Sequence, residues 1–151
     1  MFFCMKALIQ RVLQVSVWVE GRQISRTGEG LLVFLGVERG DDRKDADYLI
    51  DKILNLRIFE DDEGKMNLSL LDIKGEVMVV SQFTLAADCR RGRRPSFTEA
   101  EEPERAKELY LYFAEGVGQK ASRVGTGEFG ALMIIEVTHH GPVTFMLDSR
   151  R

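Results

Sequence analysis

The chain has 151 residues, 44% of them hydrophobic and 30% charged, and its formal net charge is −3. This length and composition predict one soluble globular domain, and the charge excludes a general attraction to nucleic acid, so any such contact must come from a local patch. Two cysteines are too few for a disulfide framework, and no apolar stretch reaches the about 20 residues that cross a bilayer. We therefore expect a cytoplasmic protein without a membrane segment.

The first part of the chain favours strands. Residues 6–19 contain valines that alternate with other residues, which is the period of a strand with one buried face. A turn signal at residues 20–21 favours a short returning arm at residues 23–25. Residues 31–35 are a continuous apolar run between glycines, as in a central strand.

A helix is predicted over residues 44–56, because its apolar positions recur at helical spacing. Asp41 or Asp42 can cap its start. The pattern then predicts a strand over residues 57–59 and a polar, solvated loop over residues 60–65.

Further along, residues 77–80 form an apolar strand pattern, and residues 86–96 form an irregular stretch. A second helix is expected to begin at Pro103, which suits the first turn of a helix. We expect it to end at about Gly116, with Gly116 and Gly118 as its stop signals.

The last two predicted strands cover residues 131–137 and 143–147. Strands then outnumber helices, and no repeat or linker interrupts the chain. This order predicts a single α+β domain over residues 1–151, with a curved, barrel-like, mostly antiparallel sheet and two main helices packed on it.

Two short polar motifs stand where predicted strands end. Residues 81–85 (SQFTL) follow one apolar strand, and residues 141–144 (GPVT) come after another. A hydroxyl, an amide and an aromatic ring at one strand end indicate a pocket that recognises and binds a small polar ligand. Glycine before proline gives stiff backbone without a side chain, whose carbonyls can wall a pocket. We therefore expect recognition largely by main-chain groups.

Nucleophilic catalysis by Ser81 or Thr84 requires a base that takes the hydroxyl proton. The two histidines, His139 and His140, are adjacent, and neighbouring side chains on a strand point to opposite faces. A Ser-His-Asp arrangement therefore has no positive signal, and the alternative is that these hydroxyls bind local backbone. The histidines are also too close in sequence to hold one ion together, so we expect no metal and no cofactor.

A compact basic loop holds four arginines within residues 90–94. Guanidinium forks suit phosphate oxygens, which makes this loop a candidate for phosphate recognition. The alternative is a solvated loop neutralised by the acids that follow it, namely Glu99, Glu101, Glu102 and Glu104. Phe97 beside the loop has two interpretations as well, stacking on a base or anchoring the loop to the core.

Five segments together resemble the D-aminoacyl-tRNA deacylases, also called D-tyrosyl-tRNA deacylases. They occur in the order and at the spacing of that family, from about residue 5 to the end of the chain. The segments are residues 7–12 (ALIQRV), 57–60 (RIFE) with 64–67 (GKMN), 81–85, 94–97 (RPSF) and 141–144. Residues 1–4 extend beyond the usual start of the family, and we expect them to lie outside the core.

The resemblance implies the fold of that family and a homodimeric cytosolic enzyme of translation proofreading. Such an enzyme hydrolyses the ester between a D-amino acid and the terminal adenosine of tRNA, and it also removes glycine from mischarged tRNA. The resemblance assigns one wall of the pocket to Ser81, Gln82, Phe83 and Thr84. Gly141 and Pro142, joined by a cis bond, are assigned to the opposite wall and come from the partner subunit. Their fixed carbonyls reject an L side chain by collision.

The resemblance also implies a mechanism in which the 2′-hydroxyl of the terminal ribose helps to activate water. Backbone groups stabilise the oxyanion, and Thr84 positions the substrate without attacking it. Arg91, Arg93, Arg94 and Phe97 are the further expected substrate contacts.

The chain departs from the family pattern in two places. His139 and His140 stand where Asn-Asp is common, and the basic loop is richer in arginine than the usual Lys-Gly-Asn-Arg. Two alternative functions stay open, an inactive tRNA-binding module of the same fold and a conventional Ser/Thr hydrolase of small esters.

Overall fold

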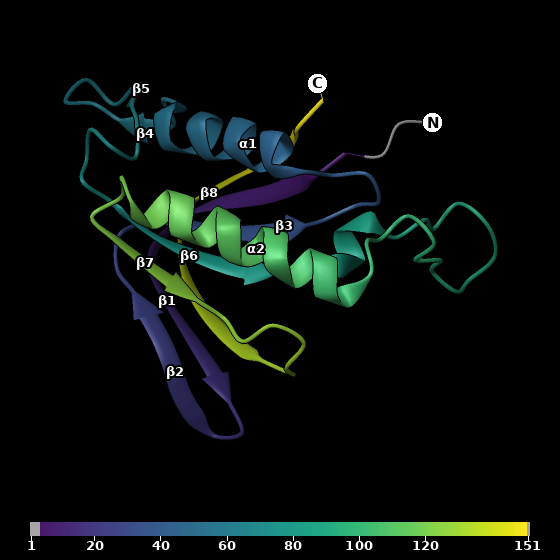
Figure 1. Cartoon of the computed structure of the whole chain (residues 1–151). Helices are drawn as coiled ribbons and strands as arrows, with labels where there is room; N and C mark the ends of the chain where they lie inside the picture. The colour runs from purple at the N-terminus through teal and green to yellow at the C-terminus, as the bar shows by residue number, and fades with distance from the viewer. Residues whose placement is uncertain (1–3, 151) are drawn as a thin grey trace.

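The structure, a computed structural model, describes residues 4–150 (Figure 1). Its centre is a six-stranded sheet in the order β2-β1-β3-β6-β7, with β8 paired to β1. These strands are β1 (Lys6–Val19), β2 (Arg22–Thr27), β3 (Gly30–Gly36), β6 (Glu76–Ser81), β7 (Arg123–Thr126) and β8 (Ile134–Asp148). The sheet curves into a nearly closed barrel, and a small hairpin of β4 (Phe59–Glu60) and β5 (Met66–Leu68) stands apart from it.

The long strand β1 organises the sheet because it pairs with three other strands. It runs antiparallel to β2, β3 and β8, whereas β6 runs parallel to both β3 and β7. The predicted curved and mostly antiparallel sheet is thus confirmed, with a parallel centre that the sequence pattern did not reveal.

Helices α1 (Arg43–Asn55) and α2 (Pro103–Gly118) lie side by side over one face of the sheet (Figure 1). The start of α1 is closed by a capping box, in which Asp42 accepts from the amide of Lys44 and Asp45 accepts from the amide of Asp42. Asp41, the other expected cap, instead accepts a hydrogen bond from the amide of Glu38. A short 3-10 helix, η1 (Phe83–Ala86), follows β6.

Helix α2 continues past its expected end. Gly116 lies inside the helix, and a Cβ atom at this position would meet Cδ1 of Ile50 on α1 at 2.6 Å. The glycine therefore allows the two helices to approach closely and does not stop α2, which ends at Gly118.

The strands β3 and β6 are buried on both faces, as expected for a parallel centre covered on each side. Gly30 shows how closely they approach, because a Cβ atom there would lie 1.8 Å from the carbonyl oxygen of Glu76. No side chain fits at this position while the register of the two strands is kept.

Two hydrophobic cores lie on the two faces of the sheet. The larger one fills the space between the sheet and the helices, where the hydroxyl of Tyr110 on α2 donates to the carbonyl of Val79 on β6 at 2.9 Å. The smaller one fills the inside of the curve and contains Val15, Met78 and Val80. The end of β6 is thereby held from both sides.

The beginning of β1 and the end of β8 are joined. The amide of Ser149 donates to the carbonyl of Met5 at 2.9 Å, and the amide of Met5 donates to Oγ of Ser149 at 3.1 Å. Cys4, expected outside the core, is instead buried, and its thiol donates to Asp148 at 3.3 Å. Residues 1–3, the rest of the expected extension, lie outside the described residues.

Several boundaries differ from the expected ones. The two final strands expected over residues 131–137 and 143–147 form the single strand β8, because both parts pair with β1. The strand expected over residues 57–59 begins only at Phe59. The hairpin strand β5 and the short strand β7 were not predicted, because neither shows a strand period of useful length. Among residues 4–150, no helix combines the length and apolarity needed to cross a membrane.

Candidate active site

A cavity of about 750 Å³ lies where β6 ends. Its walls come from the end of β6 and the start of η1, from the first turn of α2, and from the segment that leads into β8. The polar and aromatic residues of its lining are Arg39, Ser81, Gln82, Phe83, Phe97, Glu101, Glu102 and Phe129. A cavity of this size lies within the range of small-molecule binding sites. Three residues of the motif predicted from the sequence therefore line one cavity.

The turn after Ser81 is fixed by backbone contacts. The amide of Gln82 donates to the carbonyl of Leu35 at 2.8 Å, which holds the turn against the end of β3. The amides of Phe83 and Thr84 begin η1 and have no acceptor among residues 4–150. Phe83 lines the cavity and Thr84 does not, so the amide of Phe83 is the one suited to binding an oxyanion there.

Thr84 is exposed and is not part of the cavity wall. Its hydroxyl oxygen accepts a hydrogen bond from Nε2 of Gln82, and this is the one contact that the hydroxyl makes within the described residues. No histidine, carboxylate or lysine there accepts its proton. The geometry therefore supports a positioning role for Thr84 and offers no base for nucleophilic attack.

Gly141 and Pro142 form an exposed bulge on β8. On β1, Gln10 and Val12 pair with Thr144 and His139, so residues 140–143 all lie opposite Arg11. The Gly141–Pro142 peptide bond is cis. A Cβ atom on Gly141 would lie 2.3 Å from the amide nitrogen of Val143, so the bulge has no space for a side chain there.

Arg11 holds this bulge from behind. Its side chain is 4% exposed, and it donates from Nε to the carbonyl of His140 at 2.8 Å and from Nη1 to the carbonyl of Ile58 at 2.9 Å. The carboxylate of Glu60 lies 3.7 Å from Nη2. A buried arginine with carbonyl acceptors fixes backbone position, and sequence reasoning missed this role. An arginine within the alternating pattern of a buried strand was the available signal.

The two predicted motifs do not line the same cavity within one chain. Ser81, Gln82 and Phe83 line the cavity, whereas neither Gly141 nor Pro142 belongs to its lining.

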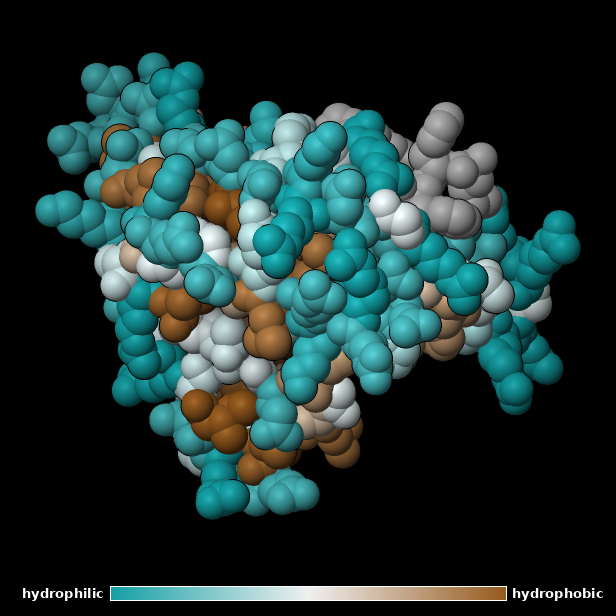
Figure 2. All heavy atoms as spheres, viewed as in Figure 1, coloured by the Kyte–Doolittle hydropathy of each residue, from teal (hydrophilic) through white to brown (hydrophobic). Residues whose placement is uncertain are grey.

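Apolar side chains reach the surface beside the cavity. Leu132 is 94% exposed and Ile134 is 68% exposed, and Phe83 at the mouth of the cavity is 56% exposed. Leu132 lines both the cavity and a neighbouring hollow formed by Trp18, Ile24 and their surroundings. Figure 2 shows hydrophobic atoms gathered in the lower part of the view, over the region of β2 and β8. Exposed apolar surface of this kind marks an interaction site.

Three of the predicted substrate contacts, Arg91, Arg93 and Arg94, lie on the exposed loop between η1 and α2, away from the cavity lining. Phe97 lines the cavity and packs against Phe83, with 5.1 Å between the ring centroids. Both rings are exposed, Phe97 by 39% and Phe83 by 56%, so this contact does not decide between stacking on a base and anchoring to the core.

The two histidines are placed differently. His139 is exposed, whereas Nδ1 of His140 is buried without a partner among the described residues. Neither histidine contacts Thr84, so neither acts as its base in this arrangement.

The chain is similar in sequence to proteins of one known family. The family profile described as D-Tyr-tRNA(Tyr) deacylase matches residues 8–148. Proteins named D-aminoacyl-tRNA deacylase from Thermosipho melanesiensis and Aquifex aeolicus are each 55% identical to the chain, over 97% of it and 99% of their own length.

Solved structures share the fold. One described as a c-Myc DNA unwinding element binding protein has a TM-score of 0.89 and 40% identity, covering 94% of this chain and 97% of its own. Another, described as a probable eukaryotic D-amino acid tRNA deacylase, has a TM-score of 0.82 at 19% identity, covers 96% of this chain and 99% of its own, and shows the fold alone. The chain therefore belongs to the D-aminoacyl-tRNA deacylase family.

Proposed function

We propose that the protein hydrolyses the ester bond between a D-amino acid and the terminal adenosine of tRNA, which releases the free D-amino acid and tRNA. The observation that carries this proposal is the match to D-aminoacyl-tRNA deacylases over nearly the whole chain, with 55% identity. The cavity beside Ser81 supports it, because its volume of about 750 Å³ suits an adenosine that bears an amino acid.

In the proposed reaction, a water molecule attacks the ester carbonyl carbon. The 2′-hydroxyl of the terminal ribose helps to orient and deprotonate this water, since the Thr84 hydroxyl has no base beside it and is not the nucleophile. The unpaired amide of Phe83, at the cavity wall, stabilises the oxyanion that forms. The bond to the ribose oxygen then breaks, and that oxygen takes the proton.

We further propose that the active unit is a homodimer in which Gly141 and Pro142 of one subunit close the cavity of the other. Two observations support this arrangement. Gly141 and Pro142 are exposed and do not line the cavity of their own chain, and the apolar side chains of Leu132 and Ile134 are exposed beside that cavity. A two-fold partner that covers this surface brings each bulge to the other cavity.

Selection of the D-enantiomer follows from this arrangement. Carbonyl groups of the bulge that face the α-carbon leave space for a hydrogen atom and collide with an L side chain. Glycine has no side chain, so the same wall does not exclude it, and glycyl-tRNA is a further substrate of the proposed enzyme.

The direct test measures ester loss from D-tyrosyl-tRNA, L-tyrosyl-tRNA and glycyl-tRNA incubated with the purified protein. We expect release of D-tyrosine and glycine and no release of L-tyrosine. Binding of charged tRNA without release would instead show an inactive tRNA-binding module. Equal cleavage of both enantiomers, or of small esters alone, would show a conventional hydrolase and refute the proposal.

A further inference from the structure

The loop between η1 and α2 carries charge that the proposed chemistry does not use. We propose that Arg91, Arg93 and Arg94 on this loop form a second site, which binds the phosphodiester backbone of the acceptor end of tRNA while the cavity holds the terminal adenosine. This inference rests on the proposed function, since it extends the contact with the same substrate.

The loop has a defined neck. Asp88 and Ser96 exchange two backbone hydrogen bonds, of 2.7 and 2.9 Å, which close residues 89–95 into a hairpin-like loop. Gly92 stands at its tip with a φ of 63°, a left-handed conformation that suits glycine. A hollow of about 420 Å³ lies at the neck, between Asp88, Arg90, Arg91 and Ser96. The arginines are therefore presented on a closed turn.

The four arginines have two different roles. Arg90 forms a bidentate pair with Asp88, with Nε at 2.9 Å from Oδ1 and Nη2 at 2.8 Å from Oδ2, and this pair lowers the pKa of the Asp88 carboxyl below its usual range. Arg91, Arg93 and Arg94 make no hydrogen bond or ion pair with residues 4–150. One arginine thus shapes the loop, and three guanidinium groups stay available for a ligand.

The acids that follow the loop form no ion pair with it, although the charge of Glu99 helps to raise the pKa of Arg90, after the larger effect of the Asp88 contact. No ion pair joins Glu99, Glu101, Glu102 or Glu104 to the arginines of the loop within the described part of the chain. The loop is a local positive patch on a chain whose net charge is −3. Guanidinium groups bind phosphate oxygens in a planar fork, so a polyanionic backbone is the ligand that this patch favours.

The loop is attached to the rim of the cavity. Phe97, directly after the neck, lines the cavity and packs on Phe83 of the active-site motif. Beyond it, the amide of Glu101 donates to the carbonyl of Val37 at 3.0 Å, which ties the segment to the sheet. A hairpin of this length extends about 10–13 Å from its neck, at about 3.3 Å per residue. It therefore reaches beyond the cavity, where the nucleotides next to the terminal adenosine lie.

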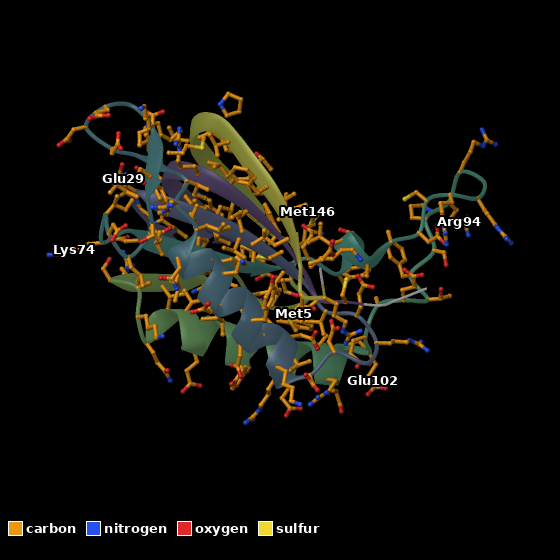
Figure 3. All side chains as sticks on the ribbon, turned by 90° about the horizontal axis from the view of Figure 1, so that it is seen from above. Met5, Glu29, Lys74, Arg94, Glu102 and Met146 are labelled. Atoms are coloured by element: carbon orange, nitrogen blue, oxygen red, sulfur yellow. The ribbon has the colours of Figure 1, made fainter. Side chains whose placement is uncertain are left out.

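The direction of the loop agrees with this placement. Figure 3 shows Arg94 far out on the loop, at the opposite end of the molecule from Glu29 and Lys74. In Figure 2 the corresponding part of the surface protrudes and is hydrophilic. The loop is thus accessible to a macromolecule that already has its end in the cavity.

The test compares a substrate with phosphates to one without them. D-tyrosyl-tRNA and D-tyrosyl-adenosine carry the same ester, but only the tRNA has a phosphodiester backbone. We expect the triple variant Arg91→Ala, Arg93→Ala, Arg94→Ala to lower the ratio of kcat/KM for D-tyrosyl-tRNA to kcat/KM for D-tyrosyl-adenosine by about tenfold or more, mainly through KM. An unchanged ratio would overturn the inference, including the case in which both substrates lose activity equally.

Binding of uncharged tRNA gives a second readout that needs no catalysis. Three lost phosphate contacts reduce the slope of log Kd against log salt concentration by about 2–3, at about 0.7–0.9 per contact. The control variant Lys65→Ala, Lys74→Ala, Lys120→Ala removes the same charge far from the loop and should keep the slope of the native protein. A slope that changes equally in both variants would show a general charge effect and no site on the loop.

These two measurements also separate this inference from the proposed function. Failure of the native protein to cleave either substrate refutes the deacylase activity, whereas the salt dependence still reports on the loop. Cleavage of both substrates with an unchanged ratio and an unchanged slope refutes the loop site alone.

Discussion

Arg11 donates a hydrogen bond of 2.8 Å from Nε to the carbonyl oxygen of His140, the residue directly before Gly141. Its Nη1 donates at the same time to the carbonyl of Ile58, ahead of the hairpin strand β4. One buried side chain therefore ties the exposed bulge of β8 to the body of the subunit. The bulge is held in place by a side chain that does not itself reach the solvent side of the bulge.

Replacement of Arg11 should impair activity on the D-substrate and weaken the rejection of L-tyrosyl-tRNA. Arg11→Lys keeps the positive charge but loses the fork that reaches two carbonyls, and a displaced wall costs about 10- to 100-fold in kcat/KM. Hydrolysis of D- and L-tyrosyl-tRNA is measured in parallel. Arg26→Ala, which removes an exposed arginine bound to Gln14, serves as the control. An unchanged D-to-L ratio in Arg11→Lys would contradict the positioning role, because lost stability alone lowers both rates together.

Thr84→Ala should reduce turnover without abolishing it. The Thr84 hydroxyl has no base, and its contact within the chain is the hydrogen bond from Gln82. A neutral hydrogen bond contributes about 0.5–1.5 kcal/mol, which predicts a loss of about 2- to 13-fold in kcat/KM, with Thr84→Ser close to the native protein. Single-turnover kinetics with D-tyrosyl-tRNA gives the rate of the chemical step. Complete loss of this step with tRNA binding intact would identify Thr84 as the nucleophile.

Two inactive variants should restore each other if each active site contains parts of both subunits. Gly141→Ala disturbs the bulge, because its Cβ atom would meet the amide of Val143, and Ser81→Trp fills the cavity. Half of the dimers in an equal mixture contain one of each, and such a dimer has one intact site of two. The expected activity is about one quarter of that of the native protein.

Subunit exchange is started by mixing after dilution and checked with differently tagged chains. Mixtures that stay as inactive as the separate variants, despite confirmed exchange, would refute a shared site. Gly141→Ala with Ser81→Trp in the same chain, mixed with either single variant, provides the negative control.

The contribution of Asp41 to the free energy of unfolding should fall as the pH rises from about 4 to 7. Burial, followed by the nearby Asp45 carboxylate, raises the pKa of the Asp41 carboxyl from 3.8 to about 7, although the amide of Glu38 acts in the opposite direction. The folded state then binds the proton more tightly than the unfolded state. This contribution to the free energy of unfolding is complete below the unfolded pKa, about 3.9, and is lost as the pH rises through the folded pKa.

Asp41→Asn removes this titration. We expect the difference in Tm, variant minus native protein, to be more positive at pH 8 than at pH 4.5. A change of about 1 kcal/mol in the free energy of unfolding shifts Tm by about 2–4 °C for a chain of this size. The exposed Asp62→Asn serves as the matched control, and thermal unfolding is followed by circular dichroism. Parallel pH profiles for the native protein and Asp41→Asn would show that Asp41 does not contribute in this way.

Patterns of local origin were predicted well from the sequence. The apolar stripe of α1 and its acidic cap require only neighbours within a few residues, and Asp42 does cap the helix. The strand-end motif at Ser81 was likewise found, because a polar group that follows an apolar strand is visible in the sequence. Its cavity was expected on the same grounds and is lined by that residue.

Features that depend on distant neighbours were not predictable in this way. The strand β7 contains Gly125, where a Cβ atom would meet Oγ of Ser25 at 2.6 Å. Packing against β2 therefore requires glycine at this position, and the sequence of β7 shows no strand period. Gly116 resembled a helix stop because the proximity of Ile50 was unknown. The role of Arg11 depends on the pairing of β1 with β8, which joins residues at opposite ends of the sequence.

The contact between Met5 and Ser149 has a mechanical consequence. The two residues belong to the same end of the antiparallel ladder of β1 and β8, so a force that pulls them apart acts across the strands and opens the hydrogen bonds one after another. A ladder loaded in this direction peels at low force, unlike one that is sheared along its length. The peeling front passes the pair of Gln10 and Thr144 and then reaches the bulge at Gly141. Tension on the chain would therefore disturb the proposed selectivity element while the helices and the parallel centre of the sheet are still intact.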